Sequence, residues 1–303
     1  MISATALRYF AEVTRCGSYR AAAEKLCIAP SAISRHVLLL EQEIGAPLLE
    51  RGRGRSALRL TAAGEILMQY TITVDSEMER VRSDIEALKG ERKGHLRLGV
   101  PESFARDFIP EFLARFNQRF PGITYYVEVA GSTRLVEMVG NGELDLSLTF
   151  NPPAASDVRH LYTREVPTCA LVHIDHPLAE RKSLRVSDLA EYGIAMPEGA
   201  ISAKRLYEDM FAKARIRPRK VLSSNSYELL RSVSKAGMSI AIVCEHPALG
   251  GQRGGFHRQI PIVDRNVTHE TFTVCVREGR SLPIIGLTFI DHLLKEFEAM
   301  ESA

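Results

Sequence analysis

The hydrophobic and polar positions of the first fifty residues repeat with the three- and four-residue spacing of amphipathic helices. The pattern predicts helices over residues 3–16, 18–26 and 30–44. Ser18 is a good N-cap for the second helix, and Pro30 suits the first turn of the third because its missing N–H has no helical partner there. Only a short corner separates these two helices. Two short helices joined so tightly are typical of a helix-turn-helix.

The third predicted helix has two different faces. Its inner face is apolar and consists of Ile33, Val37, Leu40 and Ile44. Its outer face begins with short or polar side chains and one guanidinium that can reach the edge of a guanine, at Pro30, Ser31, Ser34 and Arg35. This division predicts that the start of the third helix enters the major groove of DNA.

A basic hairpin is predicted after the third helix. Residues 47–51 and 57–61 have the pattern of two short strands around the tip Gly52-Arg53-Gly54-Arg55. We interpret the hairpin as a wing whose arginines contact DNA phosphates; a solvated turn is the alternative. The charge distribution favours the wing, because residues 1–61 hold nine Lys or Arg against five Asp or Glu, a net charge of +4, whereas the whole chain carries +2.

One long helix is predicted over residues 62–89. Its apolar stripe recurs at spacings of three and four residues and consists of Leu67, Tyr70, Val74, Met78, Val81, Ile85 and Leu88. At about 1.5 Å per residue the helix extends roughly 40 Å, which is too long for burial in one small domain. We expect a helix of a second copy to cover the stripe; the alternative is that the helix lies along its own C-terminal domain. Residues 90–94 are charged and glycine-containing, which is typical of a hinge.

Beyond residue 95 the pattern changes to apolar strands that alternate with amphipathic helices. Strands are expected at 96–100, 125–129, 144–150, 169–173, 192–196, 221–224, 239–244 and 271–276, and helices at 103–119, 133–140, 202–215, 226–236 and 284–297. These repeated units predict an α/β fold with parallel sheets covered by helices on both faces. They form two groups, residues 95–165 with 268–303 and residues 166–267, so we expect two subdomains with a cleft between them.

Several classes of function are excluded by what the sequence lacks. No stretch approaches the roughly 20 apolar residues of a membrane span, and charges close to the N-terminus argue against a signal peptide, so a cytoplasmic protein is expected. The five cysteines form no CxxC pair, which argues against a zinc site and a disulfide framework. GxSxG, HExxH and Walker-type motifs are also missing. We therefore expect no enzyme activity, no metal and no cofactor.

Residues 5 to about 65 closely resemble the N-terminal signature of LysR-type transcriptional regulators. The resemblance lies in LRYFAEVTRCGSYRAAAEKLCIAPSAISRHVLLLEQEIGAPLLER and in RLTAAGE, and the rest of the chain is similar more loosely. It implies an α/β fold overall, with a winged helix-turn-helix in residues 1–61, a dimerisation helix in residues 62–90, and a periplasmic-binding-protein-like effector domain of two subdomains in residues 91–303.

The resemblance also implies partners and DNA contacts. Regulators of this type are homodimers or homotetramers that bind interrupted inverted repeats in double-stranded DNA and respond to a small-molecule effector. The DNA-contacting residues implied here are Ser18, Arg20, Pro30, Ser31, Ser34, Arg35, His36, Arg51 and Arg53. The chain departs from the family at Ala29-Pro30-Ser31, where Ser-Gln-Pro is usual, and at His36, where glutamine is usual. We expect the docking mode to carry over more closely than the base preferences.

The cleft between the two subdomains is the expected effector site. Ligands of open α/β sheets sit at the carboxyl ends of strands against helix N-termini, a rule that selects Pro101, Glu102, Ser103, Ser132, Thr133, Phe150, Asn151, Ala200, Ile201, Ser202, Asn225 and Ser226. Converging hydroxyl and N–H donors suit a carboxylate or another small anion. The Glu102 carboxylate would repel such an anion unless Arg106 or Arg134 offsets its charge. A ligand that also bears a positive group, such as an amino acid, is therefore the alternative.

Two other functions are compatible with the same fold. A solute-binding module without DNA function is one, and the predicted helix-turn-helix argues against it. A redox-responsive regulator is the other, and the large sequence separation of Cys169 and Cys244 argues against a reactive pair.

Overall fold

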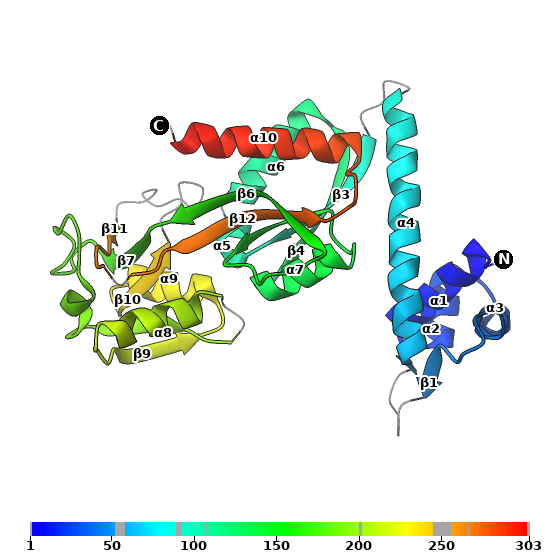
Figure 1. Cartoon of the computed structure of the whole chain (residues 1–303), viewed down its shortest axis with the longest axis horizontal. Helices are drawn as coiled ribbons and strands as arrows, with labels where there is room; N and C mark the ends of the chain where they lie inside the picture. Colours follow the sequence, from blue (N-terminus) through cyan, green and yellow to red (C-terminus); the bar gives the residue numbers. More distant parts are fainter. Residues whose placement is uncertain are drawn as a thin grey trace. The chain divides into compact units, whose positions relative to one another are not determined.

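The structure, a computed structural model, describes residues 2–51, 58–88, 93–106, 108–199, 202–244, 256–265 and 267–301. It divides into two compact units, residues Met1–Glu79 and Arg80–Ala303, and the division falls inside helix α4 (Ala62–Leu88). Each unit has its own apolar core. Figure 1 shows the helices and strands of each unit. None of the described helices is long and apolar enough to cross a membrane.

The first unit is a winged helix-turn-helix. Its elements are α1 (Ala4–Cys16), α2 (Tyr19–Leu26), α3 (Pro30–Ile44), the antiparallel strands β1 (Leu49–Arg51) and β2 (Leu58–Leu60), and the start of α4. Ser18 caps α2, as predicted, by accepting a hydrogen bond from the Ala21 N–H (3.4 Å). Cys27 ends α2 in the left-handed conformation (φ 55°), which turns the chain sharply toward α3.

The core of this unit fixes the orientation of α3. Phe10 and Val13 of α1 and Ala22 of α2 are buried against the apolar face of α3, where Ile33, Val37 and Leu40 are fully enclosed. Ile44, expected on this inner face, is exposed because the helix ends there at Gly45. Leu67, expected on the apolar stripe that a second copy would cover, is instead buried in the core of the first unit, and its neighbour Ile66 is exposed.

The second unit contains two five-stranded sheets. The first has the order β4-β3-β5-β12-β6, from strands Gly122–Val129, Lys93–Val100, Leu146–Phe150, Glu270–Arg277 and Val158–Val166. The second has the order β11-β7-β10-β8-β9, from strands His257–Pro261, Thr168–His173, Ile240–Cys244, Gly193–Pro197 and Arg219–Ser224. The chain crosses between the sheets twice, from β6 to β7 and from β11 to β12.

The expectation of purely parallel sheets is wrong. β4, β3 and β5 are parallel, as are β10, β8 and β9, but β12 runs antiparallel to β5 and β6, and β7 runs antiparallel to β10 and β11. Strands β6 and β11, which the sequence pattern did not predict, belong to these antiparallel portions. Each crossing between the sheets follows one of these two strands. Polar and apolar residues alternate only weakly along both strands, which is why the sequence pattern did not predict them.

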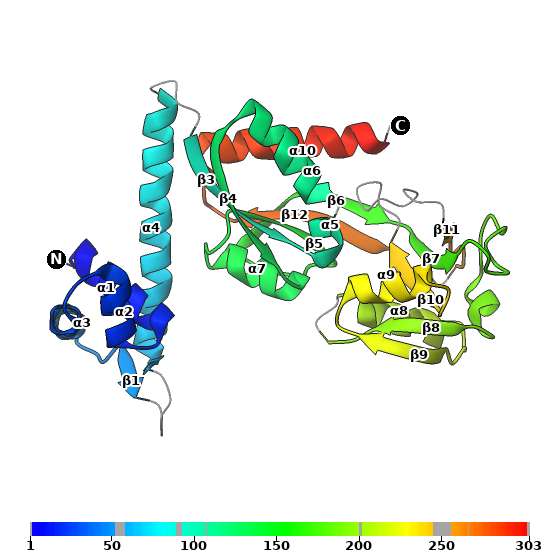
Figure 2. The same ribbon diagram turned by 180° about the vertical axis from the view of Figure 1, so that it is seen from behind.

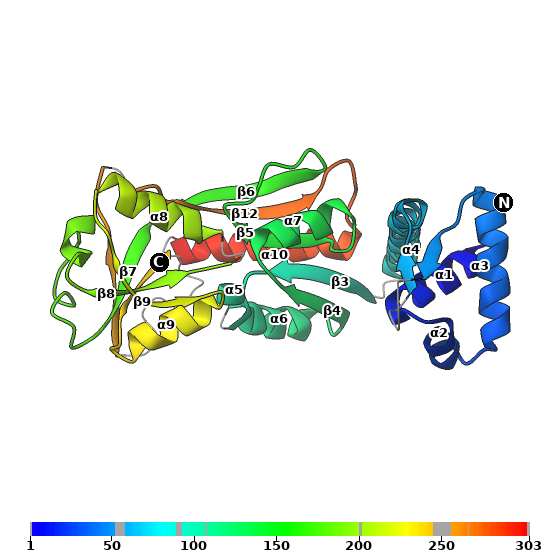
Figure 3. The same cartoon turned by 90° about the horizontal axis from the view of Figure 1, so that it is seen from below.

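Helices cover both faces of each sheet. On the first sheet, α5 (Glu102–Arg106), α6 (Phe108–Arg119) and α10 (Ile284–Glu301) pack on one face through a phenylalanine-rich core, and α7 (Ser132–Gly140) covers the other (Figure 2). The single helix predicted over 103–119 is thus two. On the second sheet, α8 (Ala203–Lys213) and α9 (Tyr227–Lys235) lie on opposite faces (Figure 3), and a short 3-10 turn spans Val186–Leu189.

Candidate functional site

The outer face of α3 presents a row of exposed side chains. Pro30, Ser31, Ser34 and Arg35 are all exposed, because the opposite side of the helix is held in the core of the first unit. His36 is half-buried, and its ring packs edge-on against Tyr9 of α1, with 5.2 Å between the ring centroids. The His36 ring on α3 is therefore held against α1.

The other residues expected to contact DNA are placed differently. Arg20 is exposed on α2 and pairs with Glu24, with 3.2 Å between its Nε and the carboxylate oxygen. The Ser18 hydroxyl caps α2 and is half-buried. Arg51 ends strand β1, and Arg53 lies outside the described residues.

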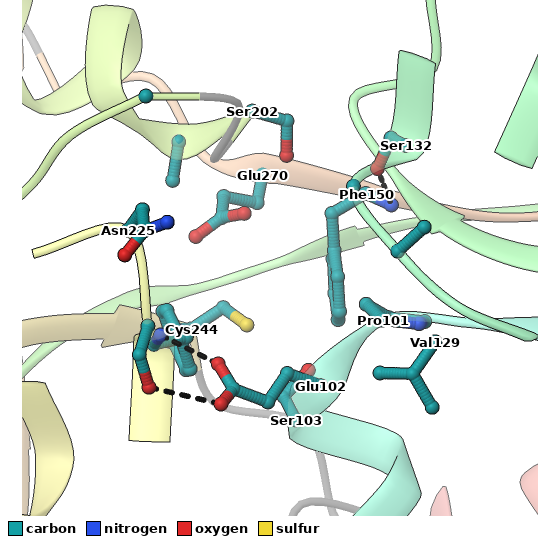
Figure 4. Close-up of a pocket in the computed structure, with 16 residues that line it drawn as sticks. Pro101, Glu102, Ser103, Val129, Ser132, Phe150, Ser202, Asn225, Cys244 and Glu270 are labelled. Carbon is teal, nitrogen blue, oxygen red and sulfur yellow. Dashed lines mark hydrogen bonds between the residues drawn. The ribbon is translucent and has the colours of Figure 1, made fainter. Parts of the chain in front are cut away.

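A cavity of about 410 Å³ opens between the two sheets of the second unit (Figure 4). Its described lining comes from both subdomains and consists of Pro101, Glu102, Ser103, Val129, Ala130, Gly131, Ser132, Phe150, Gly199, Ser202, Ala203, Asn225, Ser226, Tyr227, Cys244 and Glu270. The volume suits a small organic ligand.

Glu102 lines the cavity and caps helix α9 of the opposite subdomain. Its carboxylate accepts hydrogen bonds from the Ser226 hydroxyl (2.9 Å) and the Tyr227 N–H (2.7 Å) (Figure 4). It also accepts one from the Glu228 N–H (3.3 Å). The Ser226 hydroxyl in turn accepts from the Leu229 N–H (3.2 Å). The first N–H groups of a helix have no helical partner and carry partial positive charge, so a carboxylate is stabilised there.

Ion pairs surround this cap. Arg106 of α5 pairs with Glu228 of α9 and so adds a second link between the subdomains. Arg134, the other arginine considered as a counter-charge for Glu102, pairs with Glu137 (3.8 Å) and Glu143 (3.4 Å).

Glu270 is a buried carboxyl group in the cavity wall. It begins β12, is only 2% exposed, and accepts hydrogen bonds from the Tyr207 hydroxyl of α8 and from Asn151 Nδ2 (3.3 Å). Burial raises the pKa of Glu270 to about 7, although the hydrogen bonds from Tyr207 and Asn151 oppose this shift. Because Tyr207 belongs to the second sheet's core and Glu270 to the first sheet, this contact also joins the subdomains.

Most of the described residues that the sequence selected for the effector site line the cavity, and two do not. Thr133 is exposed outside it. Asn151 lies behind the wall, since its side chain bonds both Glu270 and the Thr271 N–H (2.7 Å). Ser132 does line it, but its hydroxyl accepts from the Phe150 N–H (3.0 Å). Ala200 and Ile201 lie outside the described residues.

Sequence reasoning missed Glu270 and Tyr227, two polar residues of the cavity lining. Glu270 is the first residue of an antiparallel strand, so the strand-end rule does not select it. Tyr227 is the first residue of α9 and lies one position beyond the residues selected after strand β9. Cys244, at the end of β10, obeys the strand-end rule and could have been selected with it. Burial raises the pKa of the Cys244 thiol well above its ordinary value, which disfavours a reactive thiolate.

Two models of known protein families match most of the chain. A family model described as "Bacterial regulatory helix-turn-helix protein, lysR family" matches residues 4–65, and one described as "LysR substrate binding domain" matches residues 89–298. The chain belongs to the LysR family. This LysR-family protein is therefore a DNA-binding transcriptional regulator with a C-terminal effector domain.

Two curated relatives are similar in sequence over most of this chain. The RuBisCO operon transcriptional regulator of Allochromatium vinosum is 30% identical over 245 residues, which cover 81% of this chain and 80% of the relative. The HTH-type transcriptional activator CmpR of Synechocystis sp. is 26% identical over 295 residues, covering 97% and 95%.

Solved structures share the fold of this LysR-family protein over nearly its whole length. A full-length OxyR variant from Pseudomonas aeruginosa has a TM-score of 0.72 at 20% identity, covering 96% of this chain and 94% of that one. Full-length CbnR in complex with its target DNA has a TM-score of 0.65 at 21% identity, covering 97% and 99%.

The raised pKa of Glu270 predicts an unusual pH dependence of folding stability. Above about pH 4.5 the unfolded chain ionises this group, whereas the folded protein keeps it protonated up to about pH 7. The free energy of unfolding should therefore fall as pH rises through this window, by about 3 kcal/mol in total from this one group.

Urea unfolding of the full chain at several pH values measures this effect. Glu270→Gln should abolish the decline relative to wild type, while Glu137→Gln, at an exposed position on α7, should keep it. Parallel stability curves for wild type and Glu270→Gln would contradict the assignment.

Proposed function

We propose that this LysR-family protein is a homo-oligomeric regulator in which a small molecule in the cavity of the second unit controls how the helix-turn-helix meets DNA. The observation that carries the proposal is the exposed outer face of α3 on a helix whose inner face is fully buried. We assign residues 1–61 to DNA binding, residues 62–90 to dimerisation and residues 91–303 to the effector, as expected from the sequence. We assign it no catalytic role and place it in the cytoplasm, where its DNA would be.

The start of α3 would read base edges in the major groove. Ser31, Ser34 and Arg35 are exposed in the first turns of the helix, and an arginine at such a place can donate two hydrogen bonds to guanine. Arg20 of α2 and the arginines of the wing would contact phosphates, which fixes the register without reading sequence. His36, packed on Tyr9, would orient the helix more than read a base.

Helix α4 would pair with its counterpart in a second copy. Ile66, Tyr70, Met78, Val81 and Ile85 are large apolar side chains on this helix, and all are exposed in the single chain. Their spacing of three, four or eight residues places them along one side of the helix. Burial of such a stripe against a second helix would remove apolar surface from water. Two recognition helices related by a twofold axis would bind an interrupted inverted repeat.

Effector binding would act by shifting a population of cleft conformations. The cavity wall contains contacts between the subdomains, at Glu102 with α9 and at Glu270 with Tyr207. A ligand among these groups would favour one relative position of the subdomains, provided that it binds that state more tightly. In an oligomer this change would alter the spacing of the DNA-binding units.

Replacement of Arg35 by alanine tests the reading of bases. Arg35→Ala should cost about 1–3 kcal/mol on a specific site and much less on random DNA, because only the specific site has the matching base. Gel-shift titration with the DNA upstream of the protein's own gene, against a random duplex, measures both. Arg20→Ala is the matched control and should weaken both to a similar extent; equal losses for Arg35→Ala would remove that residue from base reading.

A charge on the exposed stripe of α4 tests helix pairing. Val81→Asp should break the pairing, because a carboxylate would be buried without a partner in the helix–helix interface. Light scattering of the full chain should then show a lower mass than wild type. Arg82→Ala, at the next and also exposed position, should keep the wild-type mass. An unchanged mass for Val81→Asp would count against a dimer built on α4.

A further inference from the structure

The described wall of the effector cavity contains two carboxyl groups and no basic side chain. Glu102 and Glu270 are the acidic members, and the described lining residues include no Lys, Arg or His. The other lining groups are neutral: backbone, hydroxyls, one amide, one thiol and apolar side chains. The electrostatic character of this part of the wall is therefore acidic.

The helix terminus that would attract an anionic ligand is already filled. The Glu102 carboxylate takes the Ser226 hydroxyl and the N–H groups of Tyr227 and Glu228, which are the free donors at the start of α9. An effector carboxylate at this point would have to displace a carboxylate that the protein itself supplies. Helix α9 thus gives an anionic ligand no advantage in this conformation.

Among the described groups that act on Glu270 there are hydrogen-bond donors and no cation. Tyr207 and Asn151 each donate one hydrogen bond, to different carboxyl oxygens, and desolvation is the largest influence on its pKa. A carboxylate accepts up to about four hydrogen bonds, so each oxygen retains acceptor capacity toward the cavity. A buried carboxylate without a positive partner is costly, and a cation placed beside it is strongly favoured.

In the part of the chain that the structure describes, the titratable groups near Glu270 do not supply that cation, and Arg231 is not among the groups that shift the pKa of Glu270. Tyr207, Tyr227 and Cys244 face this wall, and burial raises the pKa of each well above its ordinary value, so all three are neutral. The buried Arg231 guanidinium of α9 lies 3.9 Å from Glu228 and influences Tyr227 and Cys244. Glu102 adds a negative charge to the same cavity.

We propose that the effector of this protein bears a protonated amine that binds in the cavity against the carboxylate of Glu270. The inference rests on the proposed function of the cavity as the effector site. It selects the ligand class that supplies the missing positive charge and excludes simple carboxylic acids as effectors. An ammonium group is a cation with three N–H donors, and two of them can use the acceptor capacity that remains on the Glu270 oxygens.

Thermal unfolding of the full chain with matched probe compounds tests the proposal. Three compounds share each carbon skeleton: the amino acid, the amine and the deaminated acid, as in leucine, isopentylamine and isocaproate, or phenylalanine, phenethylamine and hydrocinnamate. A probe that binds the folded state raises the midpoint temperature by mass action. Amino acids or amines should raise the midpoint, and the acids of the same skeleton should not. A shift by the acids alone, or by none of the probes, overturns the proposal.

The pH dependence of binding supplies a readout that does not need a mutant. A cationic probe requires ionised Glu270, so its affinity should fall by about tenfold per pH unit below pH 7 and level off above it. A ligand that instead accepts a hydrogen bond from protonated Glu270 would bind more weakly as pH rises, and that result overturns the proposal.

Two variants complete the test. Glu270→Gln should lose the shift caused by the amine probe, whereas Glu137→Gln, an exposed carboxylate of the same subdomain, should keep it. A full response in Glu270→Gln overturns the proposal. A gel shift with the same protein preparation measures DNA binding separately. A failure of amine binding therefore does not count against the regulator function.

Discussion

The carboxylate of Glu102 at the start of helix α9 is the contact on which the geometry of the effector domain depends. It joins the first helix of one subdomain to a helix of the other, and it satisfies two backbone N–H groups and a hydroxyl. Hydrogen bonds to a charged group contribute about 1.5–3 kcal/mol each, more than neutral ones. The ion pair between Arg106 and Glu228 reinforces the same junction. Polar contacts therefore connect the subdomains at the cleft, and Cys244 of the second sheet packs with the apolar core of the first.

A second polar contact, from Tyr207 to Glu270, lies deeper in the same cleft. The chain crosses between the two sheets twice, and these two polar contacts link the subdomains across the cleft. Both contacts end on carboxyl groups that line the cavity, so a ligand that changes the charge around either one changes the balance between cleft positions. Control by a small molecule follows from this placement, because the groups that a ligand would touch are also the groups that connect the subdomains.

Much of the fold could be predicted from the sequence, because local patterns determine it. The helix-turn-helix follows from the Ser18 cap, Pro30 and the apolar face of the third helix, and these are short-range signals. The parallel strands follow from continuous apolar runs. The antiparallel strands β6 and β11 were missed, since Val158–Val166 and His257–Pro261 are mixed in polarity and are defined by their partners across the sheet.

The candidate site was harder to predict for a physical reason. Residues at strand ends could be selected by topology, and most of those that are described line the cavity. What each one does depends on contacts made across more than a hundred residues, such as Glu102 with Tyr227 and Asn151 with Glu270. Sequence alone indicated that the Glu102 charge opposed an anion, yet only the folded structure relates that charge to a helix terminus. Likewise, Glu270 matters because its carboxyl group is buried. The burial of one polar residue leaves no pattern in the sequence from which it could be predicted.

Amide hydrogen exchange at Tyr227 and Glu228 in a Glu102→Ala variant tests the role of this contact most directly. The Glu102 carboxylate accepts hydrogen bonds from both N–H groups in the wild-type protein. Both amides should exchange about tenfold faster or more in the variant, since about 1.4 kcal/mol corresponds to a factor of ten. Glu111→Ala, at an exposed position on α6, should leave them unchanged. Equal protection of both amides in Glu102→Ala and wild type would contradict the claim that this carboxylate holds the two subdomains together.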